Sequence, residues 1–209
     1  MSLFGSTGGS MVTWLIVAIV LLVLLLIFVL PGFALVRDNE VGILTKKMSG
    51  KKLPQGKIIA SDGEIGVQAD TLMPGLYWRF PIIWKINKSR VTQIPQGSVG
   101  IVESIDGQPL QKGRLLADDV ECNSFQDAGA FLRNGGRKGP QVAILLPGTY
   151  RINTAVFRIE LTPALQVPKE MVGVVVAMDG TPLPSGYIVA PAPKGDHKHF
   201  QDGQAFISA

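Results

Sequence analysis

MPGLYWRFPIIWKINKSRVTQIPQGSVGIVESIDGQPLQKGRLLA, residues 73–117, is the stretch of this chain that decides its fold. It aligns without a gap with LPGTYRINTAVFRIELTPALQVPKEMVGVVVAMDGTPLPSGYIVA, residues 146–190, at an offset of 146 − 73 = 73 residues. Both copies begin with Pro-Gly-x-Tyr, and both contain an Asp-Gly pair, at 106–107 and 179–180. After a short insertion the match resumes with FQDAGAF from Phe125 and FQDGQAF from Phe200. A repeat of this length indicates an internal duplication.

A third, more divergent copy lies closer to the N-terminus. VGILTKKMSGKKLPQGKIIA, residues 41–60, resembles VGIVESIDGQPLQKGRLLA, residues 99–117, and leads into LMPGLYW as the later copy leads into LLPGTY. The last copy reaches Ala209 without a counterpart of GGRKGPQVAILLPGTY. Because repeat arrays need closing units that cover the last apolar face, we expect the natural protein to continue.

The local chemistry of the repeat predicts β-strands. SVGIVESI and MVGVVVAM are β-branched runs that end in Asp-Gly, a pair typical of type I′ hairpin turns, so RLLA and YIVA would be the returning strands. VFRIELT, residues 156–162, alternates apolar and polar side chains as a half-buried strand does. FQDAGAFLR, residues 125–133, is expected to form a short helix that ends before the Gly135-Gly136 pair.

The first 36 residues carry no charged side chain, because all 20 Lys and Arg and all 16 Asp and Glu follow Val36. WLIVAIVLLVLLLIFVL, residues 14–30, is apolar throughout, and a helix of about 20 apolar residues crosses the hydrocarbon core of a bilayer. A single segment of this kind argues against both a purely soluble protein and a polytopic transporter. The anchor side chains would include Trp14, Leu15, Leu22, Leu26, Phe28 and Leu30. The alternative is a cleaved signal peptide, but no basic residue precedes the run, which exceeds the usual ~7–15 apolar residues.

Basic residues beside the anchor predict its orientation. No Lys or Arg precedes the apolar run, and five follow it closely: Arg37, Lys46, Lys47, Lys51 and Lys52. The positive-inside rule then places the C-terminal side in the cytoplasm and the N-terminus outside. The same five side chains would contact anionic lipid headgroups. Aromatic residues are not interleaved with them, so the net charge of +4 indicates no nucleic-acid partner.

These observations divide the chain into five parts. We expect an extramembrane tail at 1–10, a transmembrane helix at 11–36, a first β module at 37–97, a second at 98–170 and the start of a third at 171–209. The predicted fold class is mainly β with one N-terminal transmembrane helix.

Part of the sequence resembles a known family. VRDNEVGILTKKMSGK from Val36, followed by LMPGLYWRFPIIWKINKSRVTQIP from Leu72, resembles the opening of the SPFH (band 7) domain of stomatins, prohibitins and flotillins. The resemblance implies tandem small SPFH-like β modules with short helices and no enzymatic activity. It also implies rings or cages of identical chains that organise membrane microdomains, in some members around a membrane protease, and it suggests a bacterial inner membrane. After Pro95 a further hairpin replaces the rest of that domain, an arrangement similar to the repeats of vault-like cage walls.

Residues suited to catalysis or metal binding are scarce. Cys122 is the single cysteine and is expected to be a buried hydrophobe, and His197 and His199 are expected to lie in a solvated loop. The Gly135–Gly139 stretch lacks the GK[ST] ending of a phosphate-binding loop and is expected to be a turn. We therefore predict no catalytic residue, no metal and no cofactor.

Comparison of the repeats suggests a membrane-contact site. Trp78, Phe80 and Trp84 of the first copy correspond to Arg151, Asn153 and Phe157 of the next. We take Trp78, Phe80 and Trp84 as candidates for the membrane interface, where aromatic rings are favoured. Ordinary packing within the first module is the alternative.

Two functions remain from the sequence. The first is a membrane-anchored scaffold whose partners are the lipid bilayer and further copies of the same chain. The second is a tethered β-domain subunit that regulates a membrane enzyme such as a protease. A hydrolase is a distant third, because no nucleophile and base pair is evident.

Overall fold

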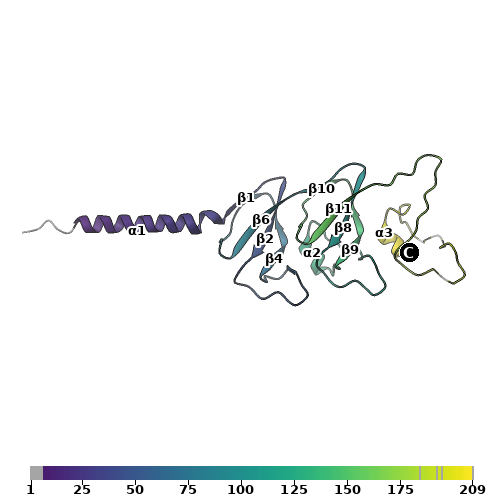
Figure 1. The fold of residues 1–209 in the computed structure, drawn as a ribbon, viewed down its shortest axis with the longest axis horizontal. Helices are drawn as coiled ribbons and strands as arrows, with labels where there is room; N and C mark the ends of the chain where they lie inside the picture. The colour runs from purple at the N-terminus through teal and green to yellow at the C-terminus, as the bar shows by residue number, and fades with distance from the viewer. Residues whose placement is uncertain (1–6, 184, 192, 194, 209) are drawn as a thin grey trace, which may run out of the picture.

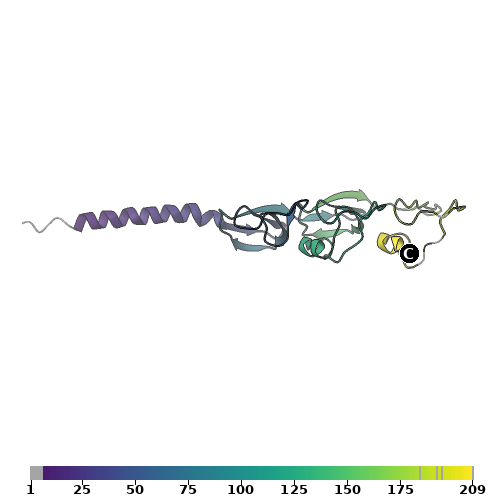
Figure 2. The same ribbon diagram turned by 90° about the horizontal axis from the view of Figure 1, so that it is seen from below.

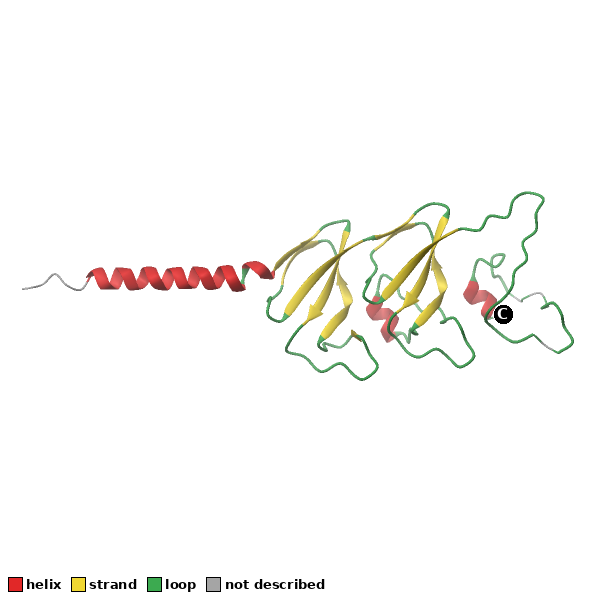
Figure 3. Ribbon diagram, in the orientation of Figure 1, coloured by secondary structure: helices red, strands yellow, loops and turns green. Residues whose placement is uncertain are grey.

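The computed structural model describes residues 7–183, 185–191, 193 and 195–208. Its parts lie in a row: an N-terminal helix, a first sheet region (residues 33–90), a second sheet region (residues 92–163) and a C-terminal region (residues 164–208) (Figure 1). A view turned by 90° shows the same linear order (Figure 2). The prediction of a mainly β chain with one apolar N-terminal helix is confirmed (Figure 3).

The apolar helix α1 spans Thr7–Phe28 and is followed by a 3-10 turn, η1, at Leu30–Gly32. Met11–Gly32 is long and apolar enough to cross a membrane. The predicted start of the transmembrane segment at residue 11 agrees with this span, whereas its predicted end at residue 36 lies too far along the chain. The helix begins at Thr7, and it ends before Pro31, which has no N–H to continue the hydrogen-bond ladder.

The first sheet region starts immediately after η1. It contains β1 (Phe33–Val36), β2 (Glu40–Lys46), β3 (Ile59–Ala60), β4 (Gly66–Leu72), β5 (Gly75–Trp78) and β6 (Trp84–Arg90). Strands β3, β4, β2 and β6 form one sheet in that order, and β1 pairs with β5 in antiparallel register. Because β1 needs the extended backbone of residues 33–36 for this pairing, these residues cannot belong to the apolar helix.

The second sheet region has a matching order of elements. It contains β7 (Thr92–Ile94), β8 (Ser98–Ser104), α2 (Ala128–Arg133), β9 (Gly139–Leu145), β10 (Gly148–Tyr150) and β11 (Phe157–Pro163). Strands β11, β8 and β9 form a sheet in that order, and β7 pairs with β10. Pairing of β7 with β10 assigns Thr92–Ile94 to the second region, so the predicted boundary at 97/98 lies several residues too late.

The predicted Asp-Gly hairpins do not form. Strand β8 ends at Ser104, and it pairs with β9 and β11 rather than with RLLA at 114–117. Of that segment, Ala117 makes an isolated parallel bridge to Gln141. The predicted strands at 98–105 and 156–162 are confirmed as β8 and β11. The short helix also forms as α2, but it starts at Ala128, because the Asp127 side chain caps its first turn.

The C-terminal region forms a helix but no strand among its described residues. Helix α3 spans Gly203–Ile207 and has Asp202 as its N-cap. The run 171–178 was predicted to be a strand, yet it makes no ladder, and Val172 is 92% exposed. Its counterpart β8 hydrogen-bonds to strands on both sides, and no described strand lies beside residues 171–178. The YIVA segment at 187–190 is likewise without a strand.

The main hydrophobic core joins the two sheet regions. Phe131, Phe157 and Phe125 form its centre, with ring centroids 4.9 Å apart for Phe131–Phe157 and 5.3 Å apart for Phe125–Phe157. Ile59 and Ala69 of the first sheet region belong to the same buried cluster. A smaller cluster of Val36, Leu44 and Leu72 lies within the first region. Since one cluster spans the boundary, the two regions pack against each other as parts of one core.

Candidate membrane interface and inter-region contacts

The first joint lies where the apolar helix meets the first sheet region. The indole Nε1 of Trp78 donates a hydrogen bond to the Val29 carbonyl at 3.1 Å, and the Arg79 N–H donates to the Gly32 carbonyl at 2.9 Å. The Val29 carbonyl also accepts from the Gly32 N–H in η1, whereas the Gly32 carbonyl at the end of this turn has the Arg79 N–H as its partner. A Cβ on Gly32 would lie 2.6 Å from the Arg79 carbonyl oxygen, and glycine is therefore required for this close approach.

The three candidate aromatic residues differ in their surroundings. Trp78 is 43% exposed and Phe80 is 38% exposed, with ring centroids 6.5 Å apart. Trp84 packs against the Val36 cluster, and the Lys46 ammonium lies 5.5 Å from its ring centroid. Contact with the membrane interface stays a prediction for Trp78 and Phe80, whereas Trp84 serves mainly as packing.

A fluorescence measurement checks the position of Trp78. The double variant Trp14→Phe, Trp84→Phe leaves Trp78 as the single tryptophan of the chain. Because indole rings favour the membrane–water interface, we expect its emission in proteoliposomes to be quenched by lipids brominated close to the headgroup. Unchanged emission with these lipids would contradict an interfacial position. The double variant Trp78→Phe, Trp84→Phe, which keeps Trp14 within the candidate membrane span, provides the reference.

The five predicted headgroup-binding residues do not form one cluster. Lys46 Nζ donates to the Gly63 carbonyl at 2.9 Å, and Lys47 Nζ donates to the Pro81 carbonyl at 3.3 Å. Arg37 is exposed on the turn between β1 and β2, and Lys51 and Lys52 are exposed on the connector between β2 and β3. Of the five, Lys47 alone lines the cleft described next.

A basic cleft lies beside the end of the apolar helix. It has a volume of about 350 Å³ and is lined on one side by η1 and β1 and on the other by β6 and the segment before it. Its basic residues are Lys47, Arg79, Lys85 and Lys88, and no acidic residue lines it. Arg79, Lys85 and Lys88 were missed from the sequence because they lie far along the chain from the anchor. The β1–β5 pairing of Val36 with Gly75 brings that part of the chain back to the helix end.

The joint between the sheet regions uses the aspartate of the first Asp-Gly pair. The Asp106 carboxylate is buried and accepts hydrogen bonds from the backbone N–H groups of Ile58 at 2.7 Å and Ile59 at 2.6 Å. A third bond comes from the Gly107 N–H at 2.8 Å. These bonds hold the start of β3 in the first region against the turn that follows β8 in the second.

The second Asp-Gly pair makes the same contact one repeat later. The Asp179 carboxylate accepts from the backbone N–H groups of Leu115 at 3.1 Å and Leu116 at 2.8 Å, and from the Arg114 guanidinium at 3.2 Å. Burial by itself would raise the pKa of Asp179, but the bonds from Leu116, Gly180 and Arg114 outweigh it, so the pKa lies below its ordinary value. An aspartate therefore joins the C-terminal region to the second sheet region, as Asp106 joins the two sheet regions.

This joint should depend on pH. A carboxyl with a folded-state pKa below its unfolded value of about 3.9 stabilises the folded state above that value, and the contribution is lost as the pH falls toward the folded pKa. We expect nuclear magnetic resonance titration of the Asp179 carboxyl carbon to give a midpoint below about 3.9. Arg114→Gln should move that midpoint upward, because it removes a positive donor. A midpoint at or above the ordinary value in the unsubstituted chain would contradict this joint.

Further contacts repeat between neighbouring regions. Buried Asn153 donates from Nδ2 to the carbonyls of Gln68 at 3.0 Å and Ala69 at 2.9 Å, which lie in β4 of the first region. Helix α2 packs on β4, and helix α3 packs on β9, the counterpart of β4. A Cβ on Gly129 of α2 would lie 2.6 Å from an oxygen of Asp70, so this helix approaches the preceding sheet closely.

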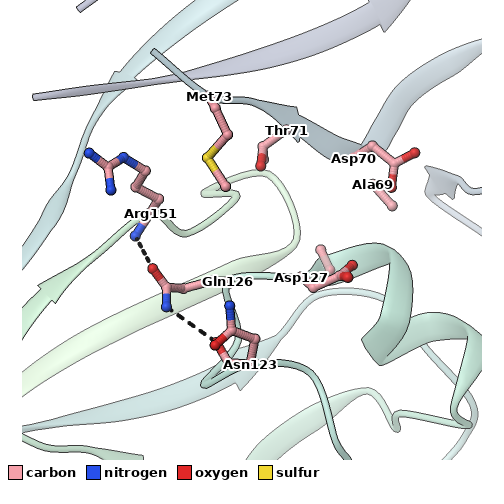
Figure 4. Close-up of a pocket in the computed structure, with 9 residues that line it drawn as sticks. Ala69, Asp70, Thr71, Met73, Asn123, Gln126, Asp127 and Arg151 are labelled. Carbon is pink, nitrogen blue, oxygen red and sulfur yellow. Dashed lines mark hydrogen bonds between the residues drawn. The ribbon is translucent and has the colours of Figure 1, made fainter. Parts of the chain in front are cut away.

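A pocket lined by polar and apolar residues of both sheet regions lies at the boundary between them (Figure 4). Gln126 accepts from the backbone N–H of Arg151 at 3.0 Å and donates from Nε2 to the Asn123 carbonyl at 3.4 Å. The Arg151 guanidinium reaches the Asp38 carbonyl at 3.2 Å. Arg151 and Trp78 occupy the same position of the repeat. Each links its own region to the element before it: Trp78 to Val29 and Arg151 to Asp38.

The residues with potential reactivity lie outside these joints. Cys122 is buried, and desolvation raises the pKa of its thiol, which disfavours the reactive thiolate. His197 packs against Phe200 and accepts a hydrogen bond on Nδ1 from the Phe200 N–H at 2.9 Å. Among the residues that the structure describes, no group of three His, Cys, Asp or Glu side chains could hold a metal ion. Gly136 packs against the Phe131 ring, so the 135–139 stretch contributes to packing beside α2.

No protein-family model, no curated protein and no solved structure matches this chain.

Proposed function

We propose that this protein is a membrane-anchored scaffold in which α1 fixes the chain in a bilayer and tandem β modules, similar to those of SPFH proteins, extend away from it. The observation that carries the proposal is that each region is hydrogen-bonded to the element before it, twice through an aspartate at the same position of the repeat. Trp78 links the first region to the helix end, Asp106 links the second region to the first, and Asp179 links the C-terminal region to the second. Contacts that recur from one repeat to the next and serve the stacking of the chain itself favour a structural role.

Copies of the chain would associate side by side into a ring or cage. Strands β6 and β11 each pair with one neighbour, β2 and β8 respectively, so each leaves one edge of its sheet open. Ile101 of β8 is 39% exposed, and its register partner Ile144 of β9 is 41% exposed. Open strand edges and exposed apolar side chains are features that suit lateral contacts between chains. Cyclic repetition of such a contact would close a ring around a membrane patch.

Mass measurement of the full chain in a mild detergent tests this assembly. We expect a particle many times the mass of one chain that persists on dilution, because a closed ring has no free contact surface. A monomer or dimer would overturn the ring or cage, and would favour a tethered accessory subunit that acts on a membrane enzyme such as a protease. Carbonate extraction of the membranes tests the anchor separately, since a cleaved or peripheral chain would be released.

The proposed orientation places the N-terminus outside and the β modules in the cytoplasm, in a bacterial inner membrane. Single cysteines at Ser6→Cys and Ser185→Cys allow this to be tested in whole cells with a membrane-impermeant maleimide. The native Cys122 interferes little because it is buried. Labelling of the Ser6→Cys variant alone is the expected result, and labelling of the Ser185→Cys variant alone would reverse the orientation.

A further inference from the structure

The basic cleft beside the end of α1 combines two kinds of lining. Pro31, Phe33 and Leu35 form an apolar side, and Phe33 and Leu35 are 50% and 53% exposed. The opposite side carries the basic residues Lys47, Arg79, Lys85 and Lys88 together with the apolar residues Pro81, Trp84 and Ile86. The apolar side continues directly from Met11–Gly32, the segment able to span a membrane. A ligand that fits this lining has an anionic group next to an apolar part.

The positive charges of the cleft are not neutralised from within the described part of the chain. Arg79, Lys85 and Lys88 make no ion pair there, and Lys47 Nζ contacts a carbonyl oxygen rather than a carboxylate. Four cations around one cleft repel one another, and an anion bound among them relieves that repulsion. A volume of about 350 Å³ is within the range of small-molecule sites.

We propose that this cleft binds the phosphate group of an anionic glycerophospholipid whose acyl chains run beside α1. The inference rests on the proposed role of α1 as a membrane anchor, which puts the cleft at the depth of the headgroups. Arg79, Lys85 and Lys88, which line the cleft, supply the positive charge for the phosphate, and Phe33 and Leu35 lie on the side of the glycerol and upper acyl region. The site differs from the juxtamembrane set expected from the sequence, of which it includes Lys47 alone.

Native mass spectrometry of the full chain in detergent, titrated with phosphatidylglycerol or phosphatidylcholine, tests the site. We expect retained phosphatidylglycerol adducts on the unsubstituted chain and on the order of tenfold weaker retention for the variant Lys85→Gln, Lys88→Gln. Lys112→Gln, Lys138→Gln is the matched control: it removes the same charge from exposed residues outside the cleft and should retain the lipid. Lys85→Arg, Lys88→Arg should also retain it, which separates loss of charge from loss of fold.

Three results would overturn the proposal. Retention of phosphatidylcholine to the same extent as phosphatidylglycerol would show that the site does not select for negative charge. An equal loss of phosphatidylglycerol from the cleft variant and from the control variant would show that the cleft is not the binding site. Displacement by inorganic phosphate at concentrations similar to the lipid would show a site for free phosphate instead. The mass of the assembly, read in the same spectra, is independent of these results. A monomer that retains phosphatidylglycerol would contradict the proposed scaffold and support the lipid site. A ring that shows no preference for phosphatidylglycerol would support the scaffold and contradict the lipid site.

Discussion

Replacement of Phe131 by alanine is expected to lower the free energy of unfolding by about 3–5 kcal/mol. The Phe131 side chain is fully buried, and its ring centroid lies 4.9 Å from that of Phe157 and 6.2 Å from that of Phe125. Close packing of Gly136 against the same ring leaves little freedom for the site to collapse around the cavity. Because this core joins the two sheet regions, both should lose stability together. Urea unfolding of the full chain in detergent, followed by circular dichroism, measures the change.

The chain contains its own control for this prediction. Phe206 has the same place in FQDGQAF as Phe131 has in FQDAGAF, but it is only partly buried, with its ring 5.6 Å from that of Phe200. Phe206→Ala removes the same atoms from a site where less apolar surface is shielded from water, and a clearly smaller loss is expected. Equal losses of unfolding free energy for the two variants would show that the deeper burial of Phe131 adds no stability.

Replacement of Asp106 by alanine is expected to loosen the joint between the two sheet regions. The backbone N–H groups of Ile58 and Ile59 lose their acceptor, and a buried donor left without a partner costs about 1–3 kcal/mol. With two such donors affected, hydrogen exchange at these two amides should accelerate by on the order of a hundredfold or more. Exchange followed by nuclear magnetic resonance or by mass spectrometry of the 57–60 segment gives the rates.

Asp179→Ala provides the reciprocal comparison. It should accelerate exchange at Leu115 and Leu116 and leave Ile58 and Ile59 unchanged, because each aspartate accepts from a different pair of amides. If Asp106→Ala left the Ile58 and Ile59 amides as protected as before, the carboxylate would not be what holds the two regions together there.

Periodicity and repetition predicted those elements whose partners are present in the chain. The β-branched run at 98–105 and the alternating run at 156–162 both became strands, because each lies next to the other in the second sheet. The similar run at 171–178 was equally well predicted and forms no strand, because backbone hydrogen bonds in a sheet come from a neighbour and no described strand lies there. Strand propensity thus identified the candidates, and pairing decided which were realised.

The Asp-Gly pairs show where local reasoning failed. Asp-Gly is a common hairpin turn, and RLLA and YIVA looked suitable as returning strands. The structure instead uses the aspartate side chain as an acceptor for the preceding region, a contact across 47 and 48 residues of sequence for Asp106. One signal was available, because the aspartate recurs at 179 in the same position of the repeat. Recurrence indicated a role, but only the spatial neighbour shows which one.

The candidate membrane site was partly accessible from sequence. The apolar segment and the nearby Lys47 were evident, and comparison of the copies singled out Trp78. The cleft itself could not be foreseen, since it combines residues 31–35 with residues 79–88 through the pairing of β1 with β5. Strand register of that kind depends on the fold as a whole and is not encoded near either segment.

The aspartate joint also bears on how proteins of this design can change in length over evolution. In the two later copies the acceptor is an aspartate side chain, and most of its donors are main-chain N–H groups, such as those of Ile58 and Leu116. Every residue other than proline has a main-chain N–H. A duplicated repeat therefore already contains both the aspartate and the main-chain donors that this contact needs. Lengthening by duplication therefore requires no new donor side chain for the aspartate joint at the seam between the copies.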